Sequence, residues 1–175
     1  MITWNDESRS LFLRLLASGP ALLQVWEEID FVDIPGRLIP EWLAIRNRPS
    51  ASAAHRYTID RHSVEVVTRL GRETPRGNRY DDRHYQALLL AGILHDVGKR
   101  PGVADHAAEG ARHASMVLKR MGFDRDIIWW VTLLVREHLT LSEFATGQNP
   151  NDPNVGDELA SRLDHDRCCL TCCSI

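Results

Sequence analysis

Histidine and aspartate side chains recur in four separate segments of the chain, at the ends or on the apolar stripes of stretches with helical periodicity. These side chains are His62, His95 with Asp96, Asp105 with His106, and His138. Imidazole nitrogens and carboxylate oxygens together suit Zn, Mn, Fe or Mg in an open hydrolytic site. The four segments therefore predict a buried divalent metal site assembled from several helices.

The adjacent pair His95 and Asp96 is the most specific local signal. Neighbouring positions on a helix point about 100° apart, so both side chains can reach one ion only if the backbone changes course there. Gly98, two residues further on, allows such a bend. A single histidine on an apolar stripe, such as His62 or His138, is more often a core residue with one satisfied hydrogen bond. The combination favours the ligand interpretation.

The remaining histidines lack such placement. His84, His113 and His165 are interpreted as facing solvent. His55, followed by Arg56, stands in the approach to the first histidine-bearing helix and could line the mouth of a cleft.

The first 54 residues are predicted to form a helical lead-in. A helix opens at Asn5 or Asp6, Gly19 and Pro20 separate it from a second helix, and a short third helix follows. The side chains expected to face inward are Leu11, Leu15 and Leu16, then Leu22, Leu23 and Trp26, and finally Trp42 and Ile45.

Helical periodicity continues through the rest of the chain, and no strand-like alternation of useful length appears, so the predicted fold is all-α. Helices are expected from about residue 58 to 69, over residues 82–97, from His106 after a cap at Asp105, after a cap at Asp124, and from Asp152 and Pro153 onward. The expected inward stripes include Ile59, His62, Val66 and Leu70 in one helix and Ile127, Val131, Leu134 and His138 in another.

Composition limits the class of protein. The 175 residues, 43% of them hydrophobic, suit one compact domain. A net charge of -3 argues against nucleic acid as a partner. The longest apolar stretch, residues 87–94, is too short to cross a membrane, so a cytoplasmic location and no membrane partner are expected. All four cysteines fall in residues 166–175, unlike the dispersed cysteines of a secreted disulfide framework.

Four runs in the same order resemble a known family. They are residues 55–62 (HRYTIDRH), 94–99 (LHDVGK), 105–111 (DHAAEGA) and 134–139 (LVREHL). The chain resembles the HD superfamily of metal-dependent phosphohydrolases, whose His and His-Asp signature matches His62, His95 and Asp96. More closely, it is similar to the HD domain of the bifunctional PII uridylyltransferase/uridylyl-removing enzymes, over roughly residues 8–165.

This resemblance implies an HD-domain helical bundle at residues 55–165, preceded by the lead-in at residues 1–54 and followed by a cysteine-rich tail at residues 166–175 that is atypical or truncated. In that family the HD domain removes a nucleotidyl group from a tyrosine of the trimeric PII signal protein, so nucleotidylated PII is the implied partner. Separate nucleotidyltransferase and ACT domains complete such enzymes, and neither is expected in this chain.

The implied metal ligands are His62, His95 and Asp96 for a first divalent ion. His106 and His138 would hold a second ion or the phosphate, and Asp96 could bridge the ions or steer hydroxide. Lys99 either neutralises charge on the phosphoryl oxygens or is a solvated loop lysine. Asp105 and Glu109 are expected to orient His106.

Two departures from the family pattern keep other functions open. Residues 145–149 lack the usual basic pair, and Ser174 stands where the family has its last metal-binding aspartate; a hydroxyl is a poorer ligand for a hard cation than a carboxylate. Three functions therefore remain open, namely a phosphodiesterase acting on nucleotidylated PII, an HD phosphohydrolase acting on small nucleotides, and a catalytically weak binding module.

Overall fold

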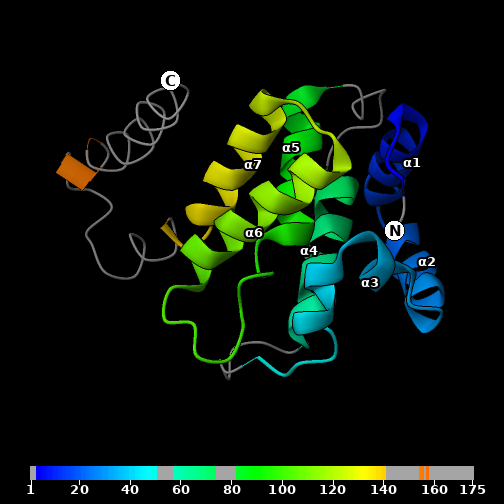
Figure 1. The fold of residues 1–175 in the computed structure, drawn as a ribbon, viewed down its shortest axis with the longest axis horizontal. Helices are drawn as coiled ribbons and strands as arrows, with labels where there is room; N and C mark the ends of the chain where they lie inside the picture. Colours follow the sequence, from blue (N-terminus) through cyan, green and yellow to red (C-terminus); the bar gives the residue numbers. More distant parts are fainter. Residues whose placement is uncertain (1–2, 51–56, 74–81, 141–153, 156, 158–175) are drawn as a thin grey trace.

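The computed structural model describes residues 3–50, 57–73, 82–140, 154–155 and 157. Helices account for the secondary structure of these residues apart from one isolated bridge between Pro49 and Thr58. The elements are α1 (Asp6–Leu16), α2 (Ala21–Phe31), α3 (Ile34–Leu38), the 3-10 helix η1 (Pro40–Ala44), α4 (Ile59–Glu73), α5 (Arg83–Leu94), α6 (His106–Met121) and α7 (Arg125–Arg136). The predicted all-α fold is confirmed (Figure 1).

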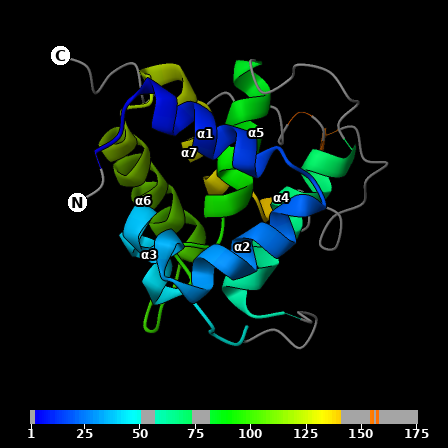
Figure 2. The same cartoon turned by 90° about the vertical axis from the view of Figure 1, so that its right-hand side faces the viewer.

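Helix α5 lies at the centre of the molecule. It packs against α4 on one side and α7 on another, while α6 packs on α7. Most of its side chains are buried, among them Leu89, Leu90 and Ile93, each 0% exposed. A helix that is apolar on nearly every side must be covered on every side, and α1, α4, α6 and α7 supply that cover (Figures 1 and 2).

The helix starts follow from capping residues that are visible in the sequence. Asn5 accepts a hydrogen bond from the backbone of Ser8 and begins α1. Asp105 and Asp124 cap α6 and α7 in the same way, through the backbone nitrogens of Ala108 and Ile127. Each cap satisfies a backbone N–H that the first turn of the helix leaves without an acceptor. The predicted starts of these three helices are confirmed.

Two expected inward positions are wrong. Leu11 is 54% exposed, and Phe12 and Leu13 face the core instead. Leu134 is 40% exposed, whereas Val135 is fully buried. Consecutive helical positions differ by about 100°, so a run of adjacent apolar residues is compatible with more than one stripe. Contact with the neighbouring helices selects which stripe is buried.

Helix α4 also differs from the expected pattern. Its most buried apolar side chains are Ile59, Val64 and Val67, while His62 and Val66 are only half-buried. His62 therefore lies at the margin of the core, where a side chain can still face a cavity.

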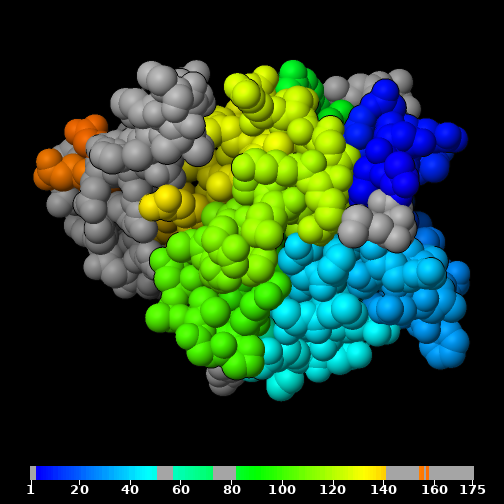
Figure 3. Space-filling view, viewed as in Figure 1, coloured from blue at the N-terminus to red at the C-terminus, as the bar shows by residue number. Residues whose placement is uncertain are grey.

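The lead-in shares its core with the rest of the chain. Helix α2 packs on α4, and α1 packs on α4 and α5. Trp26 of α2 and Trp42 of η1 lie edge to face with ring centroids 5.3 Å apart, and both belong to the same buried cluster as α5. The space-filling view shows the lead-in, coloured blue to cyan, lying directly against the green and yellow helices (Figure 3).

Some expectations fall on parts of the chain outside the described residues. Asn154, Val155 and Asp157 are helical, but the rest of the helix predicted after Pro153, His165 and the cysteine-rich tail are not described. The boundary between residues 54 and 55 stays a prediction. None of the helices in the described part of the chain has the length and apolar character needed to cross a bilayer.

One ion pair joins the lead-in to α6, and its loss should weaken the fold measurably. Arg120 donates to both carboxylate oxygens of Glu41, at 3.0 and 2.6 Å, and the Glu41 side chain is only 11% exposed. Because the geometry is bidentate and partly buried, we expect a coupling of about 1 kcal/mol in a double-mutant cycle of Glu41→Gln and Arg120→Met, measured by urea unfolding.

The coupling should also depend on pH. Burial by itself raises the pKa of Glu41, but the hydrogen bond and charge of Arg120 outweigh it and hold the pKa below the ordinary value of 4.5. A carboxyl whose pKa is lower in the folded state stabilises the protein above its unfolded pKa, and this stabilisation disappears as pH falls through the folded pKa. A coupling that is equally strong at pH 7 and in acid would contradict this origin.

Candidate metal centre

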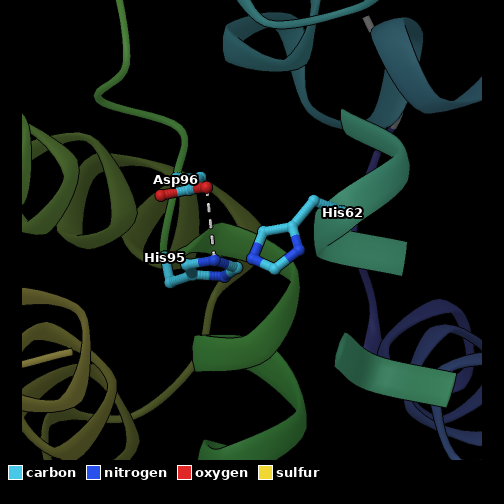
Figure 4. A group of neighbouring side chains, drawn as sticks. All are labelled: His62, His95 and Asp96. Atoms are coloured by element: carbon cyan, nitrogen blue, oxygen red, sulfur yellow. Dashed lines mark ion pairs between the residues drawn. The ribbon is translucent and has the colours of Figure 1, made fainter. Parts of the chain in front are cut away.

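The end of α5 brings His95 and Asp96 together. The helix stops at Leu94, and His95 occupies the cap position. The carbonyl oxygen of Gly92 lies 2.9 Å from His95 Nδ1, and a carbonyl can only accept, so Nδ1 carries the proton. The lone pair of His95 Nε2 is then directed at Asp96, whose Oδ2 lies 3.4 Å away (Figure 4).

His138 repeats this arrangement from the other side of the site. It follows the end of α7, and the carbonyl oxygen of Val135 lies 2.6 Å from its Nδ1. Its Nε2 lies 3.6 Å from Oδ1 of Asp96. A backbone carbonyl that fixes the tautomer and orientation of an imidazole is the usual support of a metal-binding histidine.

The predicted side chains converge around Asp96. Two groups have ligand atoms within 4.8 Å of one another: His62, His95 and Asp96 form one, and Asp96, His106 and His138 form the other. The rings of His62 and His95 lie 5.3 Å apart and those of His106 and His138 lie 5.5 Å apart. Figure 4 shows His62 reaching from α4 toward the pair at the end of α5. Asp96 belongs to both groups, as a bridging ligand would.

The hydrogen-bond pattern shows that these residues fit a cation. Within the described part of the chain, Asp96 Oδ1, His106 Nε2 and His138 Nε2 are buried and have no hydrogen-bond partner. Buried polar atoms normally have one. A neutral His138 directs a lone pair at a carboxylate oxygen, and two acceptors face each other favourably only when a positive ion lies between them.

Electrostatics keeps these groups in the form that a metal needs. Burial lowers the pKa of His106 and of His138, so both imidazoles are neutral near pH 7. Burial alone would raise the pKa of Asp96, but the hydrogen bond and positive charge of Lys99 lower it well below its usual range. Metal ions bind neutral imidazole and ionised carboxylate.

The site opens into a cavity of about 530 Å³. Besides the histidines and Asp96, its walls include three basic side chains, Arg48, Lys99 and Arg100. Lys99 is no solvated loop lysine, because its Nζ lies 2.8 Å from Asp96 Oδ2 and its side chain is 20% exposed. Within the described residues, Arg48 and Arg100 take part in no ion pair, although both are half-buried.

Sequence reasoning missed both arginines. Arg48 belongs to the lead-in, and its carbonyl oxygen accepts a hydrogen bond from Ile59 at the start of α4. This hydrogen bond holds Arg48 beside the cavity, although Arg48 is distant in sequence from His95 and Asp96. Arg100 follows the LHDVGK run directly, so its proximity to that run was the only signal that could have indicated it.

Several expectations about neighbouring residues need correction. Glu109 is directed at Arg112 and His113, with His113 Nε2 2.9 Å from its carboxylate, rather than at His106. His113 is 7% exposed and not a solvent-facing residue; it lies on the face of α6 that packs inward. Asp105 caps α6, and its charge only partly offsets the lowering of the His106 pKa by burial. His84 is exposed as expected, while His55 and Arg56 lie outside the described residues.

Gly98 is required by close packing rather than by a bend. Only Gly19, Gly102 and Gly122 among the described glycines have positive φ. A Cβ at Gly98 would lie 2.2 Å from the carbonyl oxygen of His106 and 2.4 Å from the backbone nitrogen of Gly110. The loop after Asp96 therefore rests directly on the start of α6, which sets the distance between Asp96 and His106.

Gly98→Ala should consequently lower the free energy of unfolding by about 3 kcal/mol, because two backbones must separate. Gly102→Ala is the matched control: a Cβ there meets nothing within 4 Å, and only its φ of +78° is unfavourable. Its cost should be about 1 kcal/mol. Chemical unfolding of the two variants measures the difference, and equal losses would show that the contact with α6 is unimportant.

Comparison with known families assigns the class of protein. The HD domain family matches residues 59–166, which is more than half of the chain. The chain belongs to the HD domain family.

Similar curated proteins are bifunctional uridylyltransferase/uridylyl-removing enzymes. The enzyme of Streptomyces coelicolor is 40% identical over 151 residues, covering 86% of this chain and 17% of the relative. The enzyme of Mycobacterium tuberculosis is 34% identical over 163 residues, covering 93% of this chain and 19% of the relative. The enzyme of Caulobacter vibrioides is 32% identical over 155 residues, covering 82% of this chain and 16% of the relative. The chain thus spans less than a fifth of the length of these relatives. No solved structure matches it in the same kind of comparison.

Proposed function

We propose that this chain is a divalent-metal-dependent phosphodiesterase that removes nucleotidyl groups from the PII signal protein. The single observation that supports this most strongly is the convergence of four imidazoles on Asp96, with three buried ligand atoms that lack a hydrogen-bond partner within the described residues. The uridylyl-removing relatives supply the substrate class.

In this proposal His62, His95 and Asp96 would hold one ion, and His106 and His138, together with Asp96, would hold a second. Such a divalent ion would supply Lewis acidity, which makes water a stronger nucleophile near pH 7 and favours charge on the phosphoryl group. The protein contributes orientation: Gly92 and Val135 hold the two imidazoles so that Nε2 faces the site. Manganese, magnesium, iron and zinc all suit such mixed nitrogen and oxygen ligands.

The proposed reaction is hydrolysis of a phosphodiester. Water adds to phosphorus, the bond from phosphorus to the tyrosine oxygen breaks, and a nucleoside monophosphate and free tyrosine result. The leaving phenolate has a parent pKa of about 10 and therefore needs less acid assistance than an alkoxide would. Three basic side chains of the cavity wall would bind the phosphoryl and other anionic oxygens of the substrate, namely Lys99, Arg48 and Arg100.

Incubation with nucleotidylated PII and, separately, with free nucleotides in the presence of Mn tests the substrate. The proposal expects release of the nucleoside monophosphate from PII and no turnover of the free nucleotides. Hydrolysis of free nucleotides alone would instead assign a small-molecule phosphohydrolase.

One observation favours that second function. Three cationic side chains, Arg48, Lys99 and Arg100, line the cavity, which is more positive charge than a diester with one negative charge requires. A nucleotide with several phosphates would use all three. The third possibility, a weak binding module, depends on Ser174, which lies outside the described residues. Ser174→Asp should raise metal affinity if the tail completes the site.

Lys99→Met provides a further test of the mechanism. Because the ammonium of Lys99 lies beside Asp96 without being a ligand itself, its removal should slow hydrolysis about 10- to 100-fold while the metal content stays that of the parent. Turnover and elemental analysis of the same preparation measure the two effects. Arg112→Met, which removes a cation paired with Glu109 on α6, is the control and should hydrolyse substrate at the parental rate. Unchanged turnover of Lys99→Met would exclude the proposed role.

A further inference from the structure

A second cavity lies between α2, η1 and the start of α4, apart from the metal centre. Its volume is about 250 Å³, equivalent to about eight water molecules in the liquid. The indole rings of Trp26 and Trp42 and the side chains of Asp30, Asp60 and Arg61 form its walls. The cavity therefore combines aromatic surface with charge at the junction of the lead-in and the HD bundle.

Three side chains in this wall have a buried polar atom without a hydrogen-bond partner within the described residues. One of these atoms, Asp30 Oδ1, lies 3.1 Å from Arg46 Nε in an ion pair, which leaves Trp42 and Asp60. Trp42 is 1% exposed, and its indole Nε1–H has no acceptor. Asp60 is 8% exposed; its Oδ2 accepts a hydrogen bond from the backbone nitrogen of Asn47 at 2.9 Å, but its Oδ1 has no donor. A buried polar group without a partner costs about 1–3 kcal/mol. A ligand that donates a hydrogen bond to Asp60 and accepts one from Trp42 would therefore satisfy both groups.

The charges in the wall indicate the sign of that occupant. Arg46 binds Asp30 through its side chain, at 3.1 Å, and through the carbonyl oxygen of Asp30, at 2.7 Å. Arg61 pairs with Glu27 and with Glu65. Both basic side chains are thus engaged by other acids, and within the described residues Asp60 accepts a hydrogen bond only from the backbone N–H of Asn47. Asp60 is thus the acid of this wall that forms no ion pair within the described residues, and two tryptophans line the same cavity.

We propose that this cavity binds a small organic cation whose ammonium or guanidinium group donates to Asp60 and whose carbonyl or hydroxyl oxygen accepts from Trp42. An ammonium or guanidinium group satisfies a buried carboxylate and is also attracted to the face of an indole ring. The volume limits the ligand to a few heavy atoms, because the cavity is smaller than the sites of about 300 Å³ or more that hold drug-sized molecules.

The position of the cavity gives such a ligand a structural consequence. Asp60 precedes the metal-site residue His62 by two positions on α4. The same segment holds the lead-in through the bond from Ile59 to the carbonyl oxygen of Arg48. A ligand that binds both Trp42 of η1 and Asp60 of α4 would therefore stabilise the contact between these two elements, which holds Arg48 at the metal cavity.

Glycinamide is a suitable probe because it is small and carries both an ammonium group and a carbonyl oxygen. Ethylammonium lacks the acceptor, and acetamide lacks the charge. The chain has five tryptophans, so a ¹H–¹⁵N spectrum of the whole chain contains five indole N–H signals, and Trp42→Phe assigns that of Trp42. Glycinamide should shift this signal saturably with millimolar affinity. Ethylammonium should bind at least several-fold more weakly, and acetamide should leave the signal unchanged.

Two variants distinguish binding of glycinamide in this cavity from nonspecific attraction of a cation to carboxylates elsewhere on the chain. Asp60→Asn should weaken glycinamide binding about tenfold or more, which corresponds to about 1.4 kcal/mol. Asp126→Asn, which removes an exposed carboxylate on α7, should bind as the parent does. Should Asp60→Asn fail to fold, calorimetry on Trp42→Phe replaces it and should show weaker binding. Absence of a saturable shift, or equal affinity in the parent and in the variant that folds, would overturn the proposal. None of these measurements depends on hydrolytic activity.

Discussion

Simultaneous replacement of His95 and Asp96 by alanine is expected to remove bound divalent metal from the chain. His95 supplies a ligand atom to one candidate group, and Asp96 supplies ligand atoms to both. A site that loses its shared carboxylate and one imidazole retains too few ligands to hold an ion in water. Elemental analysis after incubation with Mn and removal of free metal should show about one equivalent or more in the parent and a trace in the variant.

A control for this experiment must remove the same types of side chain from elsewhere. His84 is exposed on α5 and Asp126 is exposed on α7, so His84→Ala combined with Asp126→Ala should retain the metal content of the parent. Circular dichroism of both variants verifies the helical fold. If the His95 and Asp96 variant retains as much bound metal as the parent, the assignment of this pair is wrong.

Replacement of His138 by glutamine should reduce hydrolysis of nucleotidylated PII by at least about 100-fold, and metal content should fall with it. His138 is held by the carbonyl oxygen of Val135 with Nε2 directed at Asp96. Glutamine preserves much of the side-chain volume and the hydrogen bond to the carbonyl, but it cannot present the imidazole nitrogen to an ion.

His113 provides the comparison, because its side chain is 9% exposed, close to the 14% of His138, although His113 lies within α6 and His138 follows the end of α7. Its Nε2 contacts Glu109 at 2.9 Å, and it belongs to neither candidate metal group. His113→Gln should therefore keep the rate within about threefold of the parent, even if its stability decreases. Equal loss of activity in the two variants would indicate that burial of a histidine, rather than ligation, explains the effect. A chromogenic phosphodiester extends the same comparison if PII is not the substrate.

Much of the local structure could be predicted from the sequence because its causes lie within a few residues. The starts of α1, α6 and α7 follow from side chains that cap the first turn, and these caps act on backbone groups two or three positions away. The family could be recognised for a similar reason, since its motifs are short runs of adjacent residues.

The orientation of individual side chains was predicted less well. Leu11 and Leu134 were expected in the core, but both are exposed. Each lies beside other apolar residues, so the helix alone offers several faces of similar hydrophobicity. Which face is buried depends on the neighbouring helices, and that information is absent from a single periodic pattern.

Glu109 and His113 show the same limitation within the candidate site. Glu109 lies three residues after His106 and was expected to support it, yet it contacts His113, four residues further along the same face of α6. Both partners satisfy helical spacing, so spacing could not distinguish them.

Residue types and their neighbours along the chain were sufficient to predict the all-helical class, several helix starts and the side chains able to hold a divalent ion. The packing of the helices established three further features: Asp96 is shared by two groups of imidazoles, Gly98 rests against the backbone of α6, and Arg48 reaches the cavity from the lead-in. These features depend on distances between helices, which are set by the packing of the whole core and not by any one segment.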